Sequence, residues 1–168
     1  MAIPDYQTVM LPLLEFAGDE KLKLVRDAVE ELGKRFKLSE EEKSELLPSG
    51  KIPRFRSRVG WARTYLTKAG LLESPKRGQF KITSAGLKVL EQRPDRINVT
   101  FLEQFPAFVE FRSLRHDQSA SDSVALPAQE SESTPEESLE VAYQSIRSEL
   151  AEELTGYVRK CSPQFFEQ

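Results

Sequence analysis

The sequence contains only one cysteine, Cys161, and one histidine, His116, among its 168 residues. A single cysteine cannot form a disulfide within the chain, and such low usage is typical of proteins from a reducing compartment. One cysteine and one histidine are also too few for a zinc site built from ordinary nitrogen and sulfur ligands. His116 lies among polar, serine-rich residues, so we do not expect a histidine-based nucleophilic site either.

Long apolar runs are missing as well. No segment approaches the roughly 18 apolar residues that a membrane span requires, and the N-terminus lacks the apolar region of a signal peptide. Glycine-rich phosphate loops, dinucleotide-binding fingerprints and calcium-binding loops are also absent. We therefore expect a soluble, cytoplasmic chain without a cofactor or a metal of its own. Its length fits one ordinary domain and an appendage.

The charges of the chain are unevenly distributed. Residues 46–90 contain ten Lys or Arg and a single acid, Glu73, which gives a net charge of +9. The other 123 residues carry 14 basic and 26 acidic side chains. Charge runs are often no more than solvated faces, but so strong an asymmetry in a small chain indicates an anionic partner.

Hydrophobic periodicity predicts helices over residues 4–17, 20–33 and 54–69, and a further helix that Thr83 or Ser84 caps. Ser39 and Glu42 form a capping box that opens a short helix before the third of these. Residues 71–73 and 79–83 read as two short strands joined by a turn over residues 74–78. This order predicts a mainly α fold, a winged helix-turn-helix made of a helix bundle and a small two-stranded β-wing.

We divide the chain into a winged-helix domain over residues 1–111, a flexible linker over 112–135 and a connecting helix over 136–161. Clustered phenylalanines at 101, 105, 108 and 111 predict a helix that docks on the domain. Serine, proline and acidic residues dominate the linker. Ser162 and Pro163 are good first residues of a helix, so we expect residues 162–168 to begin a further domain.

The helix over residues 54–69 carries the DNA-binding prediction. Its apolar residues share one arc, and the opposite side presents small residues, Ser57, Gly60 and Thr64, that let a backbone approach base edges. Basic side chains on this helix and on the wing would contact guanine or phosphate. The predicted DNA-binding residues are Arg54, Arg56, Arg58, Arg63, Lys68, Lys76, Arg77 and Lys81. Of these, Arg58 lies nearest the buried arc, which makes Arg63 and Lys68 better candidates.

Other interpretations remain open at this level. Winged-helix domains also bind proteins, so the basic face could match an acidic partner, or the chain could be a transcription regulator. Trp61 could stack on a base, although a tryptophan at this position more often packs on a neighbouring helix. Glu153 interrupts a strict heptad in the apolar stripe over residues 139–157, which argues against an autonomous coiled coil. The stripe could form a homodimer or dock on another domain, and we favour docking.

Acidic residues near the N-terminus match a nuclease pattern by chance. Pro4-Asp5 and Asp19-Glu20-Lys21 fit PD-(D/E)xK in their letters. Such nucleases hold their metal with carboxylates that converge on a hairpin of strands. Asp5 instead begins a predicted helix and Asp19 lies in a turn, so we do not expect a catalytic site here.

Several segments together resemble a known family. They are RVGWARTYLTKAGLL (58–72), PKRG (75–78), ITSAG (82–86), the opening IPDY (3–6) and LPLL (11–14), and the tail from Pro135 to Glu167. The chain resembles the N-terminal domain of Mrr-like restriction endonucleases. This resemblance implies a bacterial or archaeal, type IV enzyme that cuts foreign, methylated DNA after its winged helix binds double-stranded DNA. It also implies a C-terminal PD-(D/E)xK domain with a divalent metal such as Mg²⁺. The catalytic residues of that domain are missing here, so we expect no cleavage by this chain.

Overall fold

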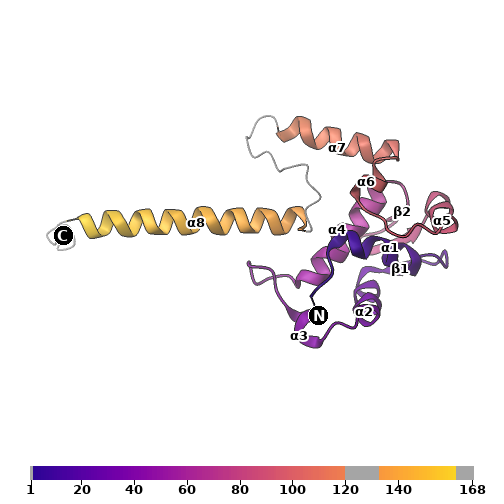
Figure 1. The fold of residues 1–168 in the computed structure, drawn as a ribbon, viewed down its shortest axis with the longest axis horizontal. Helices are drawn as coiled ribbons and strands as arrows, with labels where there is room; N and C mark the ends of the chain where they lie inside the picture. The colour runs from indigo at the N-terminus through magenta and orange to yellow at the C-terminus, as the bar shows by residue number, and fades with distance from the viewer. Residues whose placement is uncertain (1, 120–132, 162–168) are drawn as a thin grey trace.

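The computed structural model describes residues 2–119 and 133–161 (Figure 1). Its elements are α1 (Tyr6–Phe16), β1 (Lys23–Leu24), α2 (Val25–Arg35), α3 (Glu40–Ser44), α4 (Arg54–Lys68), β2 (Leu72–Glu73), β3 (Gln79–Ile82), α5 (Ser84–Glu91), α6 (Val99–Leu102), α7 (Pro106–Ser119) and α8 (Pro135–Lys160). The predicted fold class is confirmed, because a mainly helical body carries a small antiparallel sheet in the order that fits a winged helix-turn-helix.

The helix boundaries follow local capping. Asp5 caps α1, because its carboxylate accepts a hydrogen bond from the Thr8 amide at 2.7 Å. Ser39 and Glu42 form the predicted capping box at the start of α3. Thr83 caps α5 through the Gly86 amide. Side-chain oxygens in these positions satisfy amides that have no partner inside the helix.

The sheet has three strands in the order β1-β3-β2, all antiparallel. Our predicted helix over residues 20–33 begins too early, since Lys23 and Leu24 pair with Phe80 and Gln79 before α2 starts. The amide of Val25 continues this pairing by donating to the Gly78 carbonyl at 3.0 Å. A two-residue strand has no periodicity of its own, so only its distant partner reveals it.

The wing is the hairpin formed by β2, β3 and the turn between them. Gly78 has a φ of +76°, a left-handed conformation that suits glycine. The hydroxyl of Ser74 donates across the turn to the Gln79 carbonyl at 2.7 Å. These contacts fix the hairpin a few residues after the end of α4.

The core lies between α4, α1 and the sheet. The predicted inward arc of α4 is confirmed, because the side chains of Phe55, Val59, Ala62, Leu66 and Ala69 are all buried. Gly86 brings α5 against the end of α4, where a Cβ atom would stand 2.3 Å from the Leu71 carbonyl oxygen. The apolar face of α4 is therefore committed to the core.

α7 packs against α4 through aromatic side chains. Phe108 is buried, and its ring meets Tyr65 of α4 edge-on with centroids 5.8 Å apart. The predicted docking of the phenylalanine cluster is thus confirmed. α7 continues to Ser119, so the linker that we began at residue 112 overlaps a helix. Residues 120–132 and 162–168, to which the rest of the linker and the start of a further domain were assigned, lie outside the described residues.

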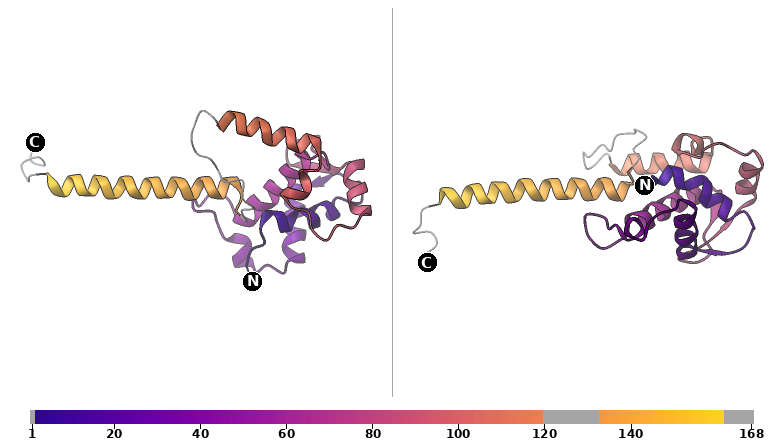
Figure 2. Two further views of the ribbon diagram at one scale, coloured as in Figure 1. Left: turned by 45° about the horizontal axis from the view of Figure 1, so that its top comes forward. Right: turned by 60° about the horizontal axis from the view of Figure 1, so that its bottom comes forward.

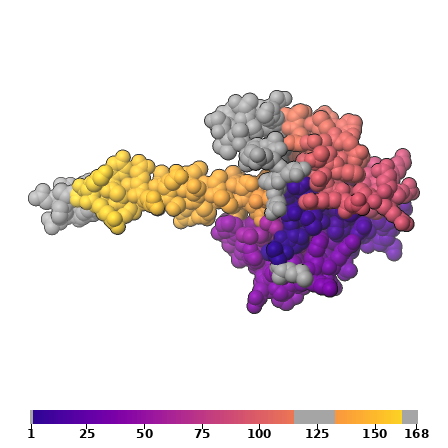
Figure 3. All heavy atoms as spheres, in the orientation of Figure 1, coloured from indigo at the N-terminus to yellow at the C-terminus, as the bar shows by residue number. Residues whose placement is uncertain are grey.

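α8 projects from the body as a single long helix (Figures 1 and 2). The space-filling view shows its C-terminal part outside the body (Figure 3). Every residue from Val141 to Thr155 is exposed. Within the described ranges, none of the helices combines the length and the apolar character that crossing a bilayer requires.

Candidate nucleic-acid interface

The predicted DNA-binding side chains fall into two groups in the structure. Six of them make no ion pair with any described residue: Arg56, Arg63, Lys68, Lys76, Arg77 and Lys81. We call these six the free cations. The other two, Arg54 and Arg58, are turned towards carboxylates.

Two of the free cations share one flank of α4. Arg56 and Arg63 lie seven residues apart, with Gly60 between them, so that all three face the same direction. A Cβ atom at Gly60 would meet nothing within 4 Å, so the helix surface is open at this residue. Arg63 is half-buried, and this burial lowers the pKa of its guanidinium, which stays protonated at neutral pH.

The other four free cations lie at the C-terminal end of α4 and on the wing. Lys68 ends α4 with its Nζ atom 5.3 Å from the centre of the Phe111 ring. Lys76 and Arg77 are exposed at the tip of the hairpin. Lys81 stands opposite Glu73 in the β2–β3 register. The wing thus presents its charge in the segment that follows α4 directly.

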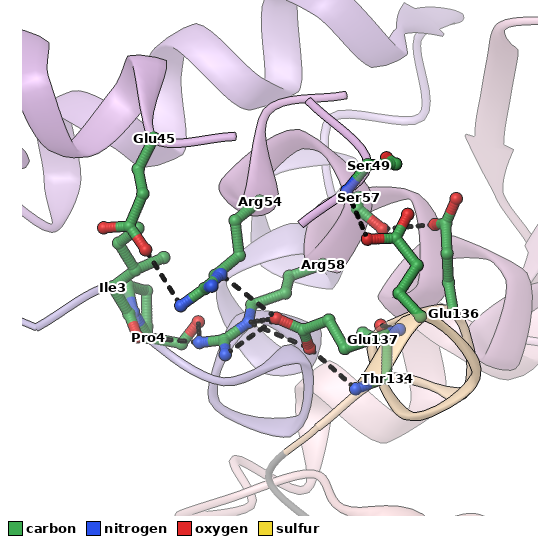
Figure 4. Close-up of polar contacts among 11 residues, drawn as sticks. Ile3, Pro4, Glu45, Ser49, Arg54, Ser57, Arg58, Thr134, Glu136 and Glu137 are labelled. Carbon is green, nitrogen blue, oxygen red and sulfur yellow. Dashed lines mark hydrogen bonds and ion pairs between the residues drawn. The ribbon is translucent and has the colours of Figure 1, made fainter. Parts of the chain in front are cut away.

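Arg58 is the centre of a partly buried polar cluster (Figure 4). Its Nη1 atom donates to the carbonyls of Ile3 at 2.9 Å and Pro4 at 3.1 Å. Its Nε and Nη2 atoms bind Glu137 of α8 at 3.1 and 3.0 Å. With its side chain 13% exposed, Arg58 is not available to a phosphate in this conformation.

Arg54 joins the same cluster from the first residue of α4. It pairs with Glu45 at 2.8 Å and lies 3.6 Å from Glu137. Its Nε atom is buried and has no hydrogen-bond partner. Two of the eight predicted DNA-binding residues therefore serve an internal ion-pair cluster, which the basic composition of α4 did not reveal.

Glu136 of α8 covers the neighbouring surface of α4. Its carboxylate accepts hydrogen bonds from the Ser57 hydroxyl at 2.5 Å and the Trp61 indole at 3.3 Å. Ser57, which we placed on the exposed face of α4, is therefore buried. Trp61 packs on Tyr65 with ring centroids 6.0 Å apart, the packing role that we considered more common for this residue.

The first turn of α8 is built to hold these carboxylates. Thr134 and Glu137 form a capping box, in which the Thr134 amide donates to Glu137 at 2.8 Å. Glu140, one turn later, accepts from the Ser49 amide at 3.1 Å. We call residues 134–140 the acidic cap. The sequence shows the helix start through Thr134, Pro135 and Glu137, but no local pattern places it on α4.

The acidic residues that match the nuclease pattern have other partners. Asp5 is the α1 cap, and Asp19 pairs with Lys23 at 2.7 Å. This hydrogen bond from Lys23 is the largest contribution that lowers the pKa of Asp19. The described residues contain no group of three or more His, Cys, Asp or Glu side chains arranged to hold a metal ion.

Comparison with known proteins gives the family. The sequence model of the family described as the Mrr N-terminal domain matches residues 6–92. This range contains α1 to α5, the three-stranded sheet and the wing. The chain belongs to the Mrr N-terminal domain family. The winged-helix body described above is thus an Mrr N-terminal domain, and the resemblance found in the sequence is confirmed.

A curated relative extends the similarity. The chain is 27% identical over 177 residues to the type IV methyl-directed restriction enzyme EcoKMrr of Escherichia coli (strain K12). This alignment covers 99% of the chain but 57% of the relative. No solved structure matches the chain. The Mrr domain is therefore similar to the N-terminal part of a longer restriction enzyme.

Proposed function

We propose that this Mrr N-terminal domain binds double-stranded DNA for an Mrr-like restriction enzyme that targets foreign, methylated DNA in a prokaryotic cytoplasm. The observation that carries the proposal is the set of six free cations on α4 and the wing. In a winged helix-turn-helix these are the elements that enter the major groove and contact the adjacent backbone. The name of the relative supports the restriction and methylation parts of the proposal.

Cleavage belongs to a different part of the parent protein in this proposal. The relative is a restriction enzyme, and this chain spans about three-fifths of its length. Asp5 and Asp19, the acidic residues that match the nuclease pattern, instead cap α1 and pair with Lys23. We therefore assign the catalytic carboxylates and a divalent metal such as Mg²⁺ to the part of such an enzyme that this chain does not cover, and DNA binding to this part.

The test is a titration of duplex DNA into the full chain at about 50 mM salt. Binding is expected, and replacement of Arg63 and Lys68 by alanine is expected to weaken it roughly tenfold, because fewer neutralised phosphates release fewer counterions. Replacement of Arg159 and Lys160, exposed on the far end of α8, is the matched control. Absence of binding by the unaltered chain would contradict DNA binding and favour a protein partner.

For α8 we propose docking against another part of the parent protein. Leu139, Tyr143, Ile146, Leu150, Leu154 and Tyr157 form its apolar stripe and are 56–71% exposed. The alignment covers 57% of the relative, so the relative has a further part against which such a stripe could pack. The isolated chain is therefore expected to sediment as a monomer, whereas a dimer would show that the stripe pairs with a second copy.

A further inference from the structure

The acidic cap lies on the N-terminal half of α4. Glu137 binds Arg58 and lies near Arg54, and Glu136 binds Ser57 and Trp61. These four α4 residues span the first two turns of the helix. Figure 4 shows both carboxylates pointing from α8 into the polar cluster at this end of α4.

This half of α4 is the part that DNA would need. In a helix-turn-helix, the N-terminal residues of the recognition helix contact base edges in the major groove. Arginine binds carboxylate and phosphate with the same planar fork, so a carboxylate can occupy the place of a phosphate. The acidic cap therefore holds a surface for which the proposed ligand would compete.

We propose that the acidic cap is an autoinhibitory element that DNA must displace from α4. The inference rests on the proposed DNA binding and adds its regulation. In this arrangement the free cations bind the backbone while the cap is in place. Release of the cap then exposes Ser57 and Trp61 and removes the Glu137 carboxylate from Arg54 and Arg58.

The structure favours a cap that can leave. Beyond Glu140, α8 is exposed from Val141 through Thr155, so the helix is held to the body by its first turns. The cap binds Arg54 only weakly, because the Arg54 Nε atom is buried and lies 3.6 Å from Glu137 without a hydrogen bond. Elements with few buried apolar contacts open at a lower free energy than the core around them.

Cap release and DNA binding are then linked. If only a fraction of the molecules is open, the apparent affinity for DNA falls by that fraction. Because such coupling is reciprocal, DNA shifts α8 away from α4 by the same factor. The cap would thus transmit the presence of bound DNA to whatever follows α8 in the parent protein.

The test compares two double variants of the full chain. Glu136→Gln with Glu137→Gln removes the two charges of the acidic cap that contact α4, while glutamine at position 137 can still complete the capping box. Glu152→Gln with Glu153→Gln removes the same charge from a part of α8 in which every side chain is exposed. The cap variant is expected to bind duplex DNA about tenfold more tightly than the control variant. Equal affinities would overturn the cap.

Trp61 provides an independent readout, because it is the only tryptophan of the chain. Without DNA, its fluorescence is expected to be quenched by acrylamide more readily in the cap variant than in the control variant. Tighter binding without this change would also overturn the cap, since charge alone would then explain the affinity.

Two further outcomes are a loss of stability in the cap variant and an absence of DNA binding by every variant. If the cap variant melts at a lower temperature, Glu136→Gln alone, which retains the Arg58–Glu137 pair, is compared with Glu152→Gln. A gain in affinity in the same direction is expected, and its absence would reject the cap. If no variant binds DNA even at low salt, the proposed function fails and the cap fails with it. If all variants bind DNA equally well, the autoinhibitory role of the cap is rejected and the proposed DNA binding stands.

Discussion

Raising the salt concentration from about 50 to about 200 mM is expected to lower the affinity of this Mrr domain for duplex DNA by roughly two to three orders of magnitude. The six free cations can neutralise about four to six phosphates, and each neutralised phosphate releases condensed counterions from the duplex. The logarithm of the association constant should therefore fall steeply and linearly with the logarithm of the salt concentration. Fluorescence anisotropy of a labelled duplex measures this slope.

The wing should account for about half of the slope of the logarithm of the association constant against the logarithm of the salt concentration. Replacing Lys76, Arg77 and Lys81 by alanine is expected to reduce the slope by about three, because each of the three cations neutralises about one phosphate. The control replaces Arg147, Arg159 and Lys160, which are exposed on α8 and carry the same total charge. An equal reduction in the control would show that the overall charge of the chain, and not the wing, attracts DNA.

Replacing Arg58 by alanine is expected to lower the free energy of unfolding by about 3 kcal/mol, because hydrogen bonds that a charged group makes contribute about 1.5–3 kcal/mol each. Arg58 binds the Ile3 and Pro4 carbonyls, which lie just before Asp5, the cap of α1. Its other partner, Glu137, lies on a helix that can lift off the body, so the removal of that pair contributes less. Urea unfolding at neutral pH measures the change.

Two controls separate these contributions. Arg56 is exposed on the same turn of α4 and makes no ion pair with a described residue, so Arg56→Ala should change the free energy of unfolding by less than about 0.5 kcal/mol. Glu137→Gln should lower the free energy of unfolding by about 1 kcal/mol or less, because the polar groups at the start of α8 can bind water once the helix leaves the body. A Glu137→Gln variant as unstable as Arg58→Ala would mean that α8 is a permanent part of the body.

The elements that the sequence predicts well are those that local chemistry specifies. Ser39 and Thr83 cap α3 and α5 as the sequence predicts. The buried side of α4 likewise follows from the spacing of its apolar residues. β1 was missed because two residues have no measurable period, and their hydrogen bonds come from β3, more than 50 residues later. The end of α7 was missed because polar residues can continue a helix.

The candidate site divides in the same way. A basic helix followed by a basic hairpin can be recognised from composition and order, so the sequence predicts Arg56, Arg63 and the wing cations as candidates for DNA binding. The contacts of Arg58 with Glu137 join residues 79 positions apart. No spacing rule relates such residues, and the charge of Arg58 looks the same in the sequence whether it faces solvent or a carboxylate.

The amino-acid sequence by itself determined the family, the helical and winged architecture and the location of the positive charge, since each depends on neighbours within a few residues or on simple composition. Only the tertiary structure decided which cations are free and which surface of α4 is covered. Those properties depend on where α8 returns to the body, and that return is selected by the complementarity of Glu136 and Glu137 to a surface that exists only after α4 has packed.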